Sequence, residues 1–420
     1  FIFILTLLWF HQRKPSNYPP GPWGFPLIGW PPRNVENFNR EILKCKENKQ
    51  DIIGWRIGTR FIVIILDYDL YIEAFRHPNI NIRPDMSSIV FQKGEGGKHM
   101  GLSLARGSRS KQNRRITLKH FRDFGMGKEK LLLDAHYEAD ELVNSLKKVD
   151  RQLISISANL QTALLNNVWQ MVGSVRYDHN DEGLIKYNEL AAKWHAHGFR
   201  MMIMDLFPWL ENILPTFMAN FLFKIHVQKE LADELKSYIK KHIDNHERDM
   251  NEGNIRDYID TYLLEMKKQK DDPYSTMSGS TLTTLTSIET AIFHLMKSPK
   301  IQEKLQKEID EFLPKGTQYL MKDRSKLPYT EAFIHETLRH ASVVGVNPRA
   351  ASEDTKIGSY VIPKDAWVFG HTFLVHFDEK LWDAPSEFRP ERFLDSNGKF
   401  VAPTKGFVPF GHACSWFQKI

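Results

Sequence analysis

The sequence predicts a mainly helical protein with a small β part. Apolar residues recur at helical spacing over six segments, and two β-branched runs, Ile52–Ile57 and Arg60–Asp67, flank a hairpin turn at Gly58-Thr59. The six segments are Leu131–Leu146, Leu153–Val172, Lys229–His246, Ile255–Lys268, Leu282–Met296 and Ile301–Phe312. Residues 356–373 return to short strands with turns at Gly358 and Pro363-Lys364. Both ends of the sequence should therefore contribute to the β part.

The composition is that of a globular protein. The chain has 420 residues, 42% of them hydrophobic and 12% aromatic, enough to bury one large core or two ordinary ones. A formal net charge of +6 is modest and favours an acidic partner surface over nucleic acid. Cys45 and Cys414 are its two cysteines, so no disulfide framework is predicted and a reducing compartment fits.

The N-terminal residues predict a membrane attachment. Residues 1–10 are nearly all apolar, and a polar stretch ending in Arg13-Lys14 follows. A bilayer span needs roughly 20 apolar residues, so residues 1–10 fit the trailing end of a transmembrane helix whose basic flank stays in the cytosol. A cleaved signal peptide is the alternative, although no small-residue cleavage site follows Phe10. Prolines crowd residues 11–27, which predicts a stiff hinge.

Several short motifs follow one another in the C-terminal part. On a helix predicted over Tyr329–His340, Glu336 and Arg339 are three residues apart and face each other. Such a pair alone says little, because Glu73-Ala74-Phe75-Arg76 has the same spacing. The pair is followed by Phe388-Arg389-Pro390-Glu391-Arg392-Phe393, then by Phe407-Val408-Pro409-Phe410-Gly411, then by Cys414. The order of these motifs is specific, although each one alone is not.

This succession resembles the cytochromes P-450, most closely their microsomal animal members. The hinge at Tyr18–Pro22, the segment Arg122–Gly127 and the helix around Lys307–Asp310 agree in order, so the resemblance covers nearly the whole chain. It implies the cytochrome P-450 fold, with residues 28–420 as one haem-thiolate monooxygenase domain. It also implies that Glu336, Arg339 and Arg392 form a buried charge triad, which is tolerable because a carboxylate between two guanidiniums is fully hydrogen-bonded.

The resemblance also assigns residues to the cofactor, haem b (iron protoporphyrin IX). Arg114 and Arg349 match two arginines that pair with haem propionates, which are carboxylates that a guanidinium binds bidentately. A solvated basic helix is the alternative for Arg114, since arginines and a lysine surround it. Phe410 and Gly411 begin the haem loop, and Cys414 would be the thiolate ligand of the iron.

Two departures concern the propionate partner and the oxygen-activating helix. Ser110 stands where the family has a tryptophan, four residues before Arg114. Leu282 replaces the family's acid, and the helix before it is short, which suggests a deletion. Thr283 is the first choice for the hydroxyl that relays protons, and Thr284 is the alternative.

The haem loop is the part of the sequence that departs most from the family pattern. Three family residues, the arginine and the glycine after the cysteine are missing between Phe410 and Trp416, and the sequence ends at Ile420 before the helix that should follow. The expected fold is therefore incomplete at both ends. Two interpretations of Cys414 stay open: a ligand on a shortened loop, or an accidental cysteine in a tail whose reading frame changes after His412.

The activity that the resemblance implies is insertion of one atom of O₂ into a hydrophobic organic substrate, either a steroid, a fatty acid or a xenobiotic. Electrons would come from NADPH through a flavoprotein, NADPH-cytochrome reductase, with a cytochrome b-type protein as a second donor. The protein would sit on the endoplasmic reticulum membrane with its catalytic domain in the cytosol. The alternative is a haem-free, inactive truncated or splice-variant remnant tethered to the membrane.

Other signals are weaker. Val343, Val344 and Val346 are candidates for the rim of a substrate pocket, with a core role as the alternative. The glycines at 94–97 favour a flexible loop over a phosphate site. The pair His242 and His246, like His195 and His197, predicts solvated helix faces rather than a metal site, because no third ligand is evident.

Overall fold

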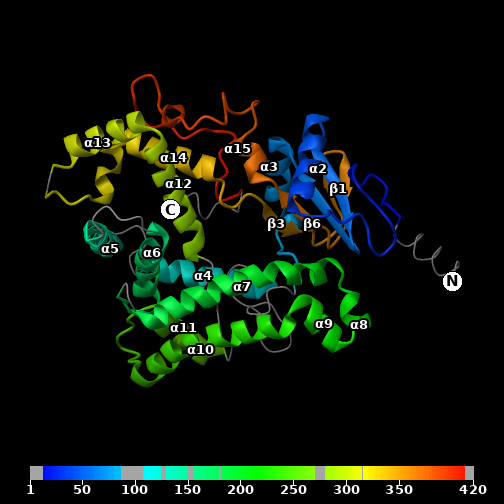
Figure 1. The fold of residues 1–420 in the computed structure, drawn as a ribbon, viewed down its shortest axis with the longest axis horizontal. Coiled ribbons are helices and arrows are strands. Elements are labelled where there is room, and N and C mark those ends of the chain that lie inside the picture. Colours follow the sequence, from blue (N-terminus) through cyan, green and yellow to red (C-terminus); the bar gives the residue numbers. More distant parts are fainter. Residues whose placement is uncertain are drawn as a thin grey trace.

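A computed structural model describes residues 13–86, 107–123, 129–148, 155–178, 181–269, 280–314 and 316–411 (Figure 1). The expected anchor at residues 1–10, the loop at 94–97 and Cys414 lie outside the described residues. Figure 1 shows a small β part flanked by α2 and α3 on one side of the molecule and a larger helical part on the other. The predicted class, mainly α with a small β part, is confirmed.

The β part consists of a four-stranded sheet in the order β1-β2-β6-β3 and a separate β4-β5 hairpin. β1 and β2 are antiparallel, β2 and β6 are parallel, and β6 and β3 are antiparallel. The strands are β1 Ile52–Ile57, β2 Arg60–Ile65, β3 Asn347–Ala350, β4 Thr355–Ile357, β5 Tyr360–Ile362 and β6 Trp367–Gly370. Both ends of the sequence thus meet in one sheet, as the sequence predicted.

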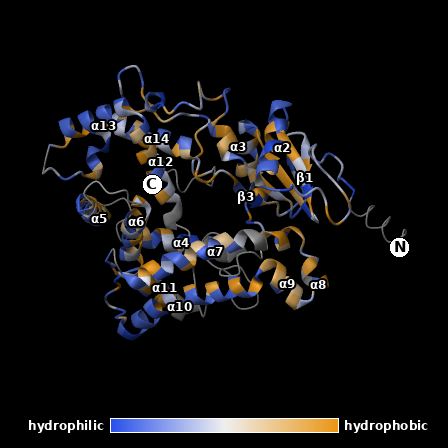
Figure 2. Cartoon of the chain, viewed as in Figure 1, coloured by the Kyte–Doolittle hydropathy of each residue, from blue (hydrophilic) through white to orange (hydrophobic). Residues whose placement is uncertain are grey.

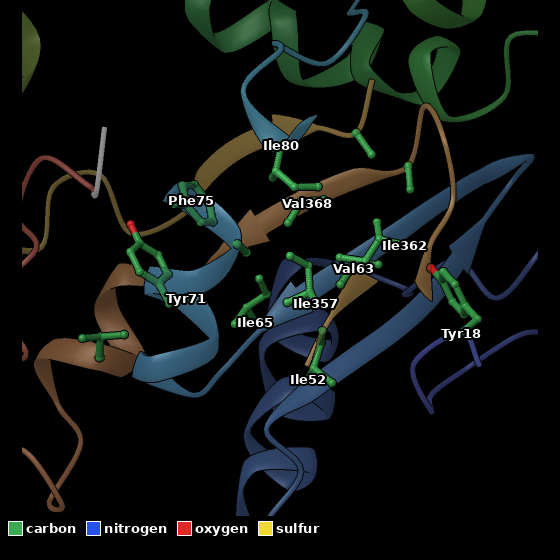
Figure 3. Packing of buried hydrophobic residues seen from close by; sticks show 14 of the residues in the cluster. Tyr18, Ile52, Val63, Ile65, Tyr71, Phe75, Ile80, Ile357, Ile362 and Val368 are labelled. Atoms are coloured by element: carbon green, nitrogen blue, oxygen red, sulfur yellow. The ribbon is translucent and has the colours of Figure 1, made fainter. Parts of the chain in front are cut away.

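Helices cover both faces of this sheet. Along β2, Val63 and Ile65 belong to one buried cluster, and the alternating residues Ile62 and Ile64 belong to the other. Helix α3 (Tyr68–Arg76) packs on the first face, shown in Figure 3 together with the β4-β5 hairpin. Helix α2 (Val35–Glu47) packs on the second face. Each fully buried aliphatic side chain here stabilises the fold by about 1.5–3 kcal/mol.

Both covering helices start at side-chain caps. Asn34 accepts a hydrogen bond from the backbone N–H of Asn37 at 2.7 Å and begins α2. Asp67 accepts one from the N–H of Leu70 at 2.9 Å and begins α3. Each cap satisfies a backbone donor that the first helical turn leaves without a partner.

The helical part contains the predicted segments, all of which are helices. The remaining helices are α4 Gly107–Asp123, α5 Glu129–Lys147, α6 Ile156–Gly173, α7 Glu182–Leu206, α8 Leu210–Ile213, α9 Thr216–Phe223, α10 Ile225–Asp249, α11 Tyr258–Gln269, α12 Ser280–Lys297, α13 Pro299–Phe312, α14 Pro328–Ala341 and α15 Thr372–His376; the 3₁₀ helices are η1 Pro78–Ile80, η4 Met321–Lys326 and η5 Pro390–Phe393. The sequence reading missed α7, whose buried residues Leu184, Tyr187 and Trp194 are widely spaced between polar residues. They pack against α10.

The proline-rich segment lies against the sheet. The N–H of Gly54 donates to the carbonyl of Pro20 at 2.8 Å, and Tyr18 is buried with its hydroxyl donating to the carbonyl of Ile62 at 2.9 Å. A Cβ on Gly54 would lie 2.4 Å from the carbonyl oxygen of Pro19, so glycine permits this close approach. From Tyr18 onward, the expected hinge is therefore part of the folded body.

Candidate functional site

Three arginines from different elements lie near one another beside the sheet. Arg349 is buried on β3, and an isolated bridge between Ile82 and Ala350 places Arg83 next to it. Arg114 projects an exposed side chain from α4. Burial, followed by the charges of Arg349 and Arg114, lowers the pKa of Arg83 from 12.5 to about 9. This arginine cluster concentrates positive charge, and an anion bound there would relieve the repulsion.

The backbone of β3 fixes two members of the arginine cluster. Arg83 Nη1 donates to the carbonyl oxygen of Pro348 at 3.1 Å. Arg349 Nη1 donates to the same carbonyl at 3.0 Å and to Asn347 Oδ1 at 3.0 Å. The sequence reading predicted Arg114 and Arg349 but missed Arg83. The one local signal that the sequence offers for Arg83 is its position before Pro84, which favours extended backbone.

The turn Phe407–Gly411 lies next to this cluster. The N–H of Gly411 donates to the carbonyl of Val408 at 2.9 Å, and Gly411 has a φ of +72°. A Cβ on Gly411 would lie only 1.8 Å from Asn347 Nδ2, so no other residue fits here without moving Asn347. Asn347 thus joins the turn to Arg349, and it is a second residue that the sequence reading missed.

Phe410, predicted to begin the cofactor loop, is 65% exposed in this turn. Cys414, three residues beyond Gly411, lies outside the described residues, as does His412. Ser110 lies in α4, one helical turn before Arg114. The described residues therefore place Phe410, Gly411 and Arg349 in one region and leave the position of the thiol open.

Glu336, Arg339 and Arg392 meet in a charge network that is buried. Glu336 and Arg339 are both 0% exposed, and the carboxylate accepts two hydrogen bonds from Arg339, at 2.7 Å from Nε and 2.8 Å from Nη2. It also accepts from Arg392 Nε at 3.3 Å and from the backbone N–H of Arg389 at 2.8 Å. Both carboxylate oxygens are used, so the charge is compensated despite burial.

The guanidiniums of this network also bind backbone carbonyls. Arg339 Nη1 donates to the carbonyl of His376 at 2.7 Å, and Arg392 donates to the carbonyls of Asp383, Ala384 and Glu387. Burial lowers the pKa of Arg392, while the adjacent Glu336 raises it in part. The network therefore ties α14, α15 and the segment before η5 together.

Thr283 and Thr284 lie in the first turns of α12, and both side chains are exposed. The carbonyl of Thr283 accepts a hydrogen bond from Ser287 Oγ at 2.9 Å. α12 packs against α6, α13 and α14. Of the three valines predicted for a pocket rim, Val346 is exposed and the other two are half-buried.

A buried polar network anchors α4, the helix that carries Arg114. Thr117 Oγ1 lies 2.9 Å from the hydroxyl of Tyr258, and His120 Nδ1 lies 2.8 Å from Thr261 Oγ1. Both contacts join α4 to α11. α4 is therefore packed on the face of Thr117 and His120, while Arg114 itself is exposed, so its interpretation as a solvated basic residue stays open.

The same network corrects the expectation for His246. It is buried rather than solvated, and its Nε2 lies 2.8 Å from Asp257 Oδ2. Hydrogen bonding to Asp257 raises the pKa of His246, although burial opposes this. Together with Asp260, His246 and Asp257 offer three atoms that could bind a metal ion, all within 4.8 Å of one another. Arg256 Nε and Nη2 already engage Asp260 at 2.8 and 3.0 Å, so the cluster is self-compensated.

An apolar cavity of about 50 Å³ lies in the helical part. It lies between α6, α7, α10 and α11 and does not include the arginine cluster. Its lining residues are Leu165, Val168, Trp169, Val172, Tyr187, Ile239, Ile243, Tyr258, Ile259, Tyr262 and Leu263.

Comparison with known proteins gives one consistent result. A family model described as Cytochrome P450 matches residues 19–412. The chain is 34% identical over 407 residues to cytochrome P450 2L1 of Panulirus argus, an alignment covering 93% of this chain and 82% of that protein. It is 29% identical over 434 residues to human cytochrome P450 2J2, covering 97% and 82% of the two chains. It is 29% identical over 430 residues to cytochrome P450 2C28 of Mesocricetus auratus, covering 97% and 84%.

Proposed function

Because this chain belongs to the cytochrome P450 family of monooxygenases, we propose that it inserts one atom of O₂ into a hydrophobic organic substrate such as a steroid, a fatty acid or a xenobiotic. The observation that carries the proposal is the arginine cluster of Arg83, Arg349 and Arg114 beside the Gly411 turn. The cluster supplies the charge that the cofactor requires at the place where the loop leading to Cys414 begins.

The family implies a haem cofactor, and the described residues fit its carboxylates. Haem carries two propionates, and two carboxylates near three guanidiniums would gain charge-assisted hydrogen bonds. They would also relieve the repulsion that, after burial, contributes to the lowered pKa of Arg83. Asn347 and Tyr71 lie beneath Gly411, so the turn comes close to β3 and α3 without a side chain between them. Phe410, exposed beside this turn, offers an apolar ring to the macrocycle.

When bound, a haem with a thiolate ligand supplies the chemistry that activates O₂. The chain's own residues hold this group and supply its thiolate ligand. Arg83, Arg349 and Arg114 bind the propionates, and Cys414 provides the thiolate. Thr283 or Thr284, exposed on α12, passes a proton through its hydroxyl. The charge network around Glu336 keeps α14 and the segment before η5 in place behind the loop.

The electron donor in this proposal is NADPH-cytochrome reductase, with a cytochrome b-type protein as a second donor. Arg115, Lys119 and Arg122 are exposed on α4. A basic face attracts an acidic partner and accelerates encounter at low salt. The rate of reduction should therefore fall as salt rises, and a rate independent of salt would argue against docking on α4.

Attachment to the endoplasmic reticulum membrane, with the domain in the cytosol, is also part of the proposal. Among the described helices, none is both long enough and apolar enough to cross a bilayer. Figure 2 shows apolar colouring over α8 and α9. Exposed large apolar residues in this area are Ile213, Phe217, Met218, Phe221 and Leu222, with Phe25, Ile28 and Trp30 on a second segment.

These two apolar segments are neighbours, because Trp209 Nε1, just before α8, donates to the carbonyl of Leu27 at 3.4 Å. A combined apolar surface of this kind suits contact with a bilayer. Protease added outside sealed microsomes should digest the domain. Full protection would refute the cytosolic orientation.

The test of the activity is the absorption spectrum of the reduced protein with carbon monoxide. Thiolate-ligated haem gives a red-shifted band that histidine-ligated haem lacks. We expect that band from the purified chain, its loss in Cys414→Ser and its retention in the matched control Cys45→Ser. Absence of the band from the unchanged chain would favour the haem-free remnant, and a band that survives Cys414→Ser would exclude Cys414 as the ligand.

A further inference from the structure

His376, the last residue of α15, contacts three separate segments of the chain. Its side chain is 0% exposed. Nδ1 lies 2.8 Å from the hydroxyl of Ser342, the residue that ends α14. Nε2 accepts a hydrogen bond from the backbone N–H of Val408 at 2.9 Å, inside the Phe407–Gly411 turn. The backbone carbonyl of His376 accepts from Arg339 at 2.7 Å.

The hydrogen bonds around His376 select one tautomer. Ser342 Oγ donates its single proton to the carbonyl of Arg339 at 2.8 Å, so toward His376 the hydroxyl is an acceptor. Nδ1 must then carry the ring proton, which leaves the lone pair of Nε2 for the N–H of Val408. The other tautomer would set the Nε2 proton against that N–H. A directed chain of hydrogen bonds therefore runs from the N–H of Val408 in the turn through His376 and Ser342 to the carbonyl of Arg339.

We propose that His376 is a positioning residue that transmits the geometry of the Glu336–Arg339 network to the turn from which Cys414 follows. This inference rests on the proposed function, since the turn matters because it precedes the thiolate. The N–H of Val408 donates to the imidazole, and the carbonyl of Val408 accepts from the N–H of Gly411 at 2.9 Å, so the residue that His376 holds also closes the turn.

The surroundings favour a neutral imidazole in this role. Burial, followed by the nearby cation of Arg339, lowers the pKa of His376 to about 3. Phe407 stacks on the imidazole with ring centroids 5.9 Å apart, and Val408 is 4% exposed in the core cluster that also contains Tyr71. The ring is therefore held on its face and at both nitrogens.

Two substitutions separate the two nitrogens of the imidazole. Counted in bonds from Cα, the amide nitrogen of His376→Asn replaces Nδ1 and keeps the donor to Ser342, but it loses the acceptor for Val408. The amide oxygen of His376→Gln replaces Nε2 and keeps that acceptor. His371→Gln is the matched control, because His371 is another buried histidine that caps the same helix α15 by accepting from Leu374 at 3.4 Å.

The measurement is amide hydrogen exchange of a peptide covering residues 407–411 in the protein without added haem. We expect His376→Asn to speed exchange at Val408 about tenfold, which corresponds to about 1.4 kcal/mol, while His376→Gln and His371→Gln stay within about threefold. A merely structural role would affect His376→Asn and His376→Gln alike, so equal exchange in the two variants, or unchanged exchange in His376→Asn, would overturn the proposal.

A second variant keeps the test decisive if His376→Asn does not fold. Ser342 has a φ of +39°, a conformation that glycine adopts readily, so Ser342→Gly removes the hydroxyl with little backbone strain. Without the hydroxyl, the tautomer of His376 is no longer fixed, and Val408 should exchange faster. Protection equal to that of the unchanged chain would contradict the mechanism. Amide hydrogen exchange is measured without haem and does not depend on haem binding. A missing carbon monoxide band would therefore refute the proposed function without affecting the exchange result for His376.

Discussion

Two groups of arginines in this protein differ in what surrounds them. In the charge network of α14, Arg339 and Arg392 both face the carboxylate of Glu336, which accepts four hydrogen bonds at full burial. In the arginine cluster, Arg83 lies near two other guanidiniums, and burial, followed by their charges, lowers its pKa.

The difference separates a structural site from a proposed binding site. A compensated ion network holds elements together, and its loss should be felt in folding. A cluster of like charges favours an anion bound beside it, and loss of one of its arginines should be felt in ligand affinity. The two groups should therefore respond in opposite ways to substitution.

The largest effect is expected for Glu336→Ala. Removing the carboxylate leaves Arg339 and Arg392 buried beside each other, which costs about 3–5 kcal/mol of unfolding free energy. The control is Glu73→Ala, because Glu73 is exposed and accepts a single hydrogen bond from the N–H of Gly358 at 2.9 Å. That control should cost about 1 kcal/mol or less. Urea unfolding measures both, and equal costs would remove the distinction between the two groups.

A smaller, opposite pattern is expected for Arg83→Met. Loss of one guanidinium should weaken haem binding about tenfold, because one charge-assisted interaction with a propionate disappears. The unfolding free energy of the haem-free protein should change by less than about 1 kcal/mol, since relief of repulsion offsets the lost hydrogen bond to Pro348. Haem titration is compared with the exposed control Arg33→Met. A fall in stability with unchanged haem affinity would place Arg83 in the structural group.

The smallest effect is expected for the contact between His246 and Asp257. Asp257 directly precedes α11, the helix that packs against α4 and so supports Arg114. Asp257→Asn should lower the unfolding free energy by about 1 kcal/mol near pH 6, because it removes the charged partner of His246. Hydrogen bonding to Asp257 raises the pKa of His246 in the folded state. Its contribution is therefore complete below the unfolded pKa of about 6.5 and is lost as the pH rises through the folded pKa.

The cost of Asp257→Asn should accordingly shrink by about pH 9. Urea unfolding at the two pH values is compared with Asp249→Asn, an exposed aspartate at the end of α10, which should show no such dependence. A cost that grows with pH would mean that the His246 pair does not stabilise the fold in its charged form.

The local pattern of residues was sufficient to predict most of the helices and strands. The hairpin at Gly58 and the long helices follow from spacing and turn residues, because each depends on neighbours within a few positions. The helix α7 was missed for the same reason, since its buried residues are few and its packing partner, α10, lies elsewhere in the sequence. The burial of His246 depends on Asp257, the residue just before α11, so spacing on α10 alone gave the wrong environment.

By itself, the sequence determined the order of the motifs, and with it the family and the residues Glu336, Arg339, Arg392, Arg114 and Arg349. Only the tertiary structure decided which arginines face a carboxylate and which face each other. Arg83 reaches Arg349 because a bridge joins Ile82 to Ala350, more than 260 positions away. His376 reaches Val408 because α15 packs beneath the turn. Local spacing carries no information on such pairs, because the electrostatics and hydrogen bonding of a side chain depend on distance in space.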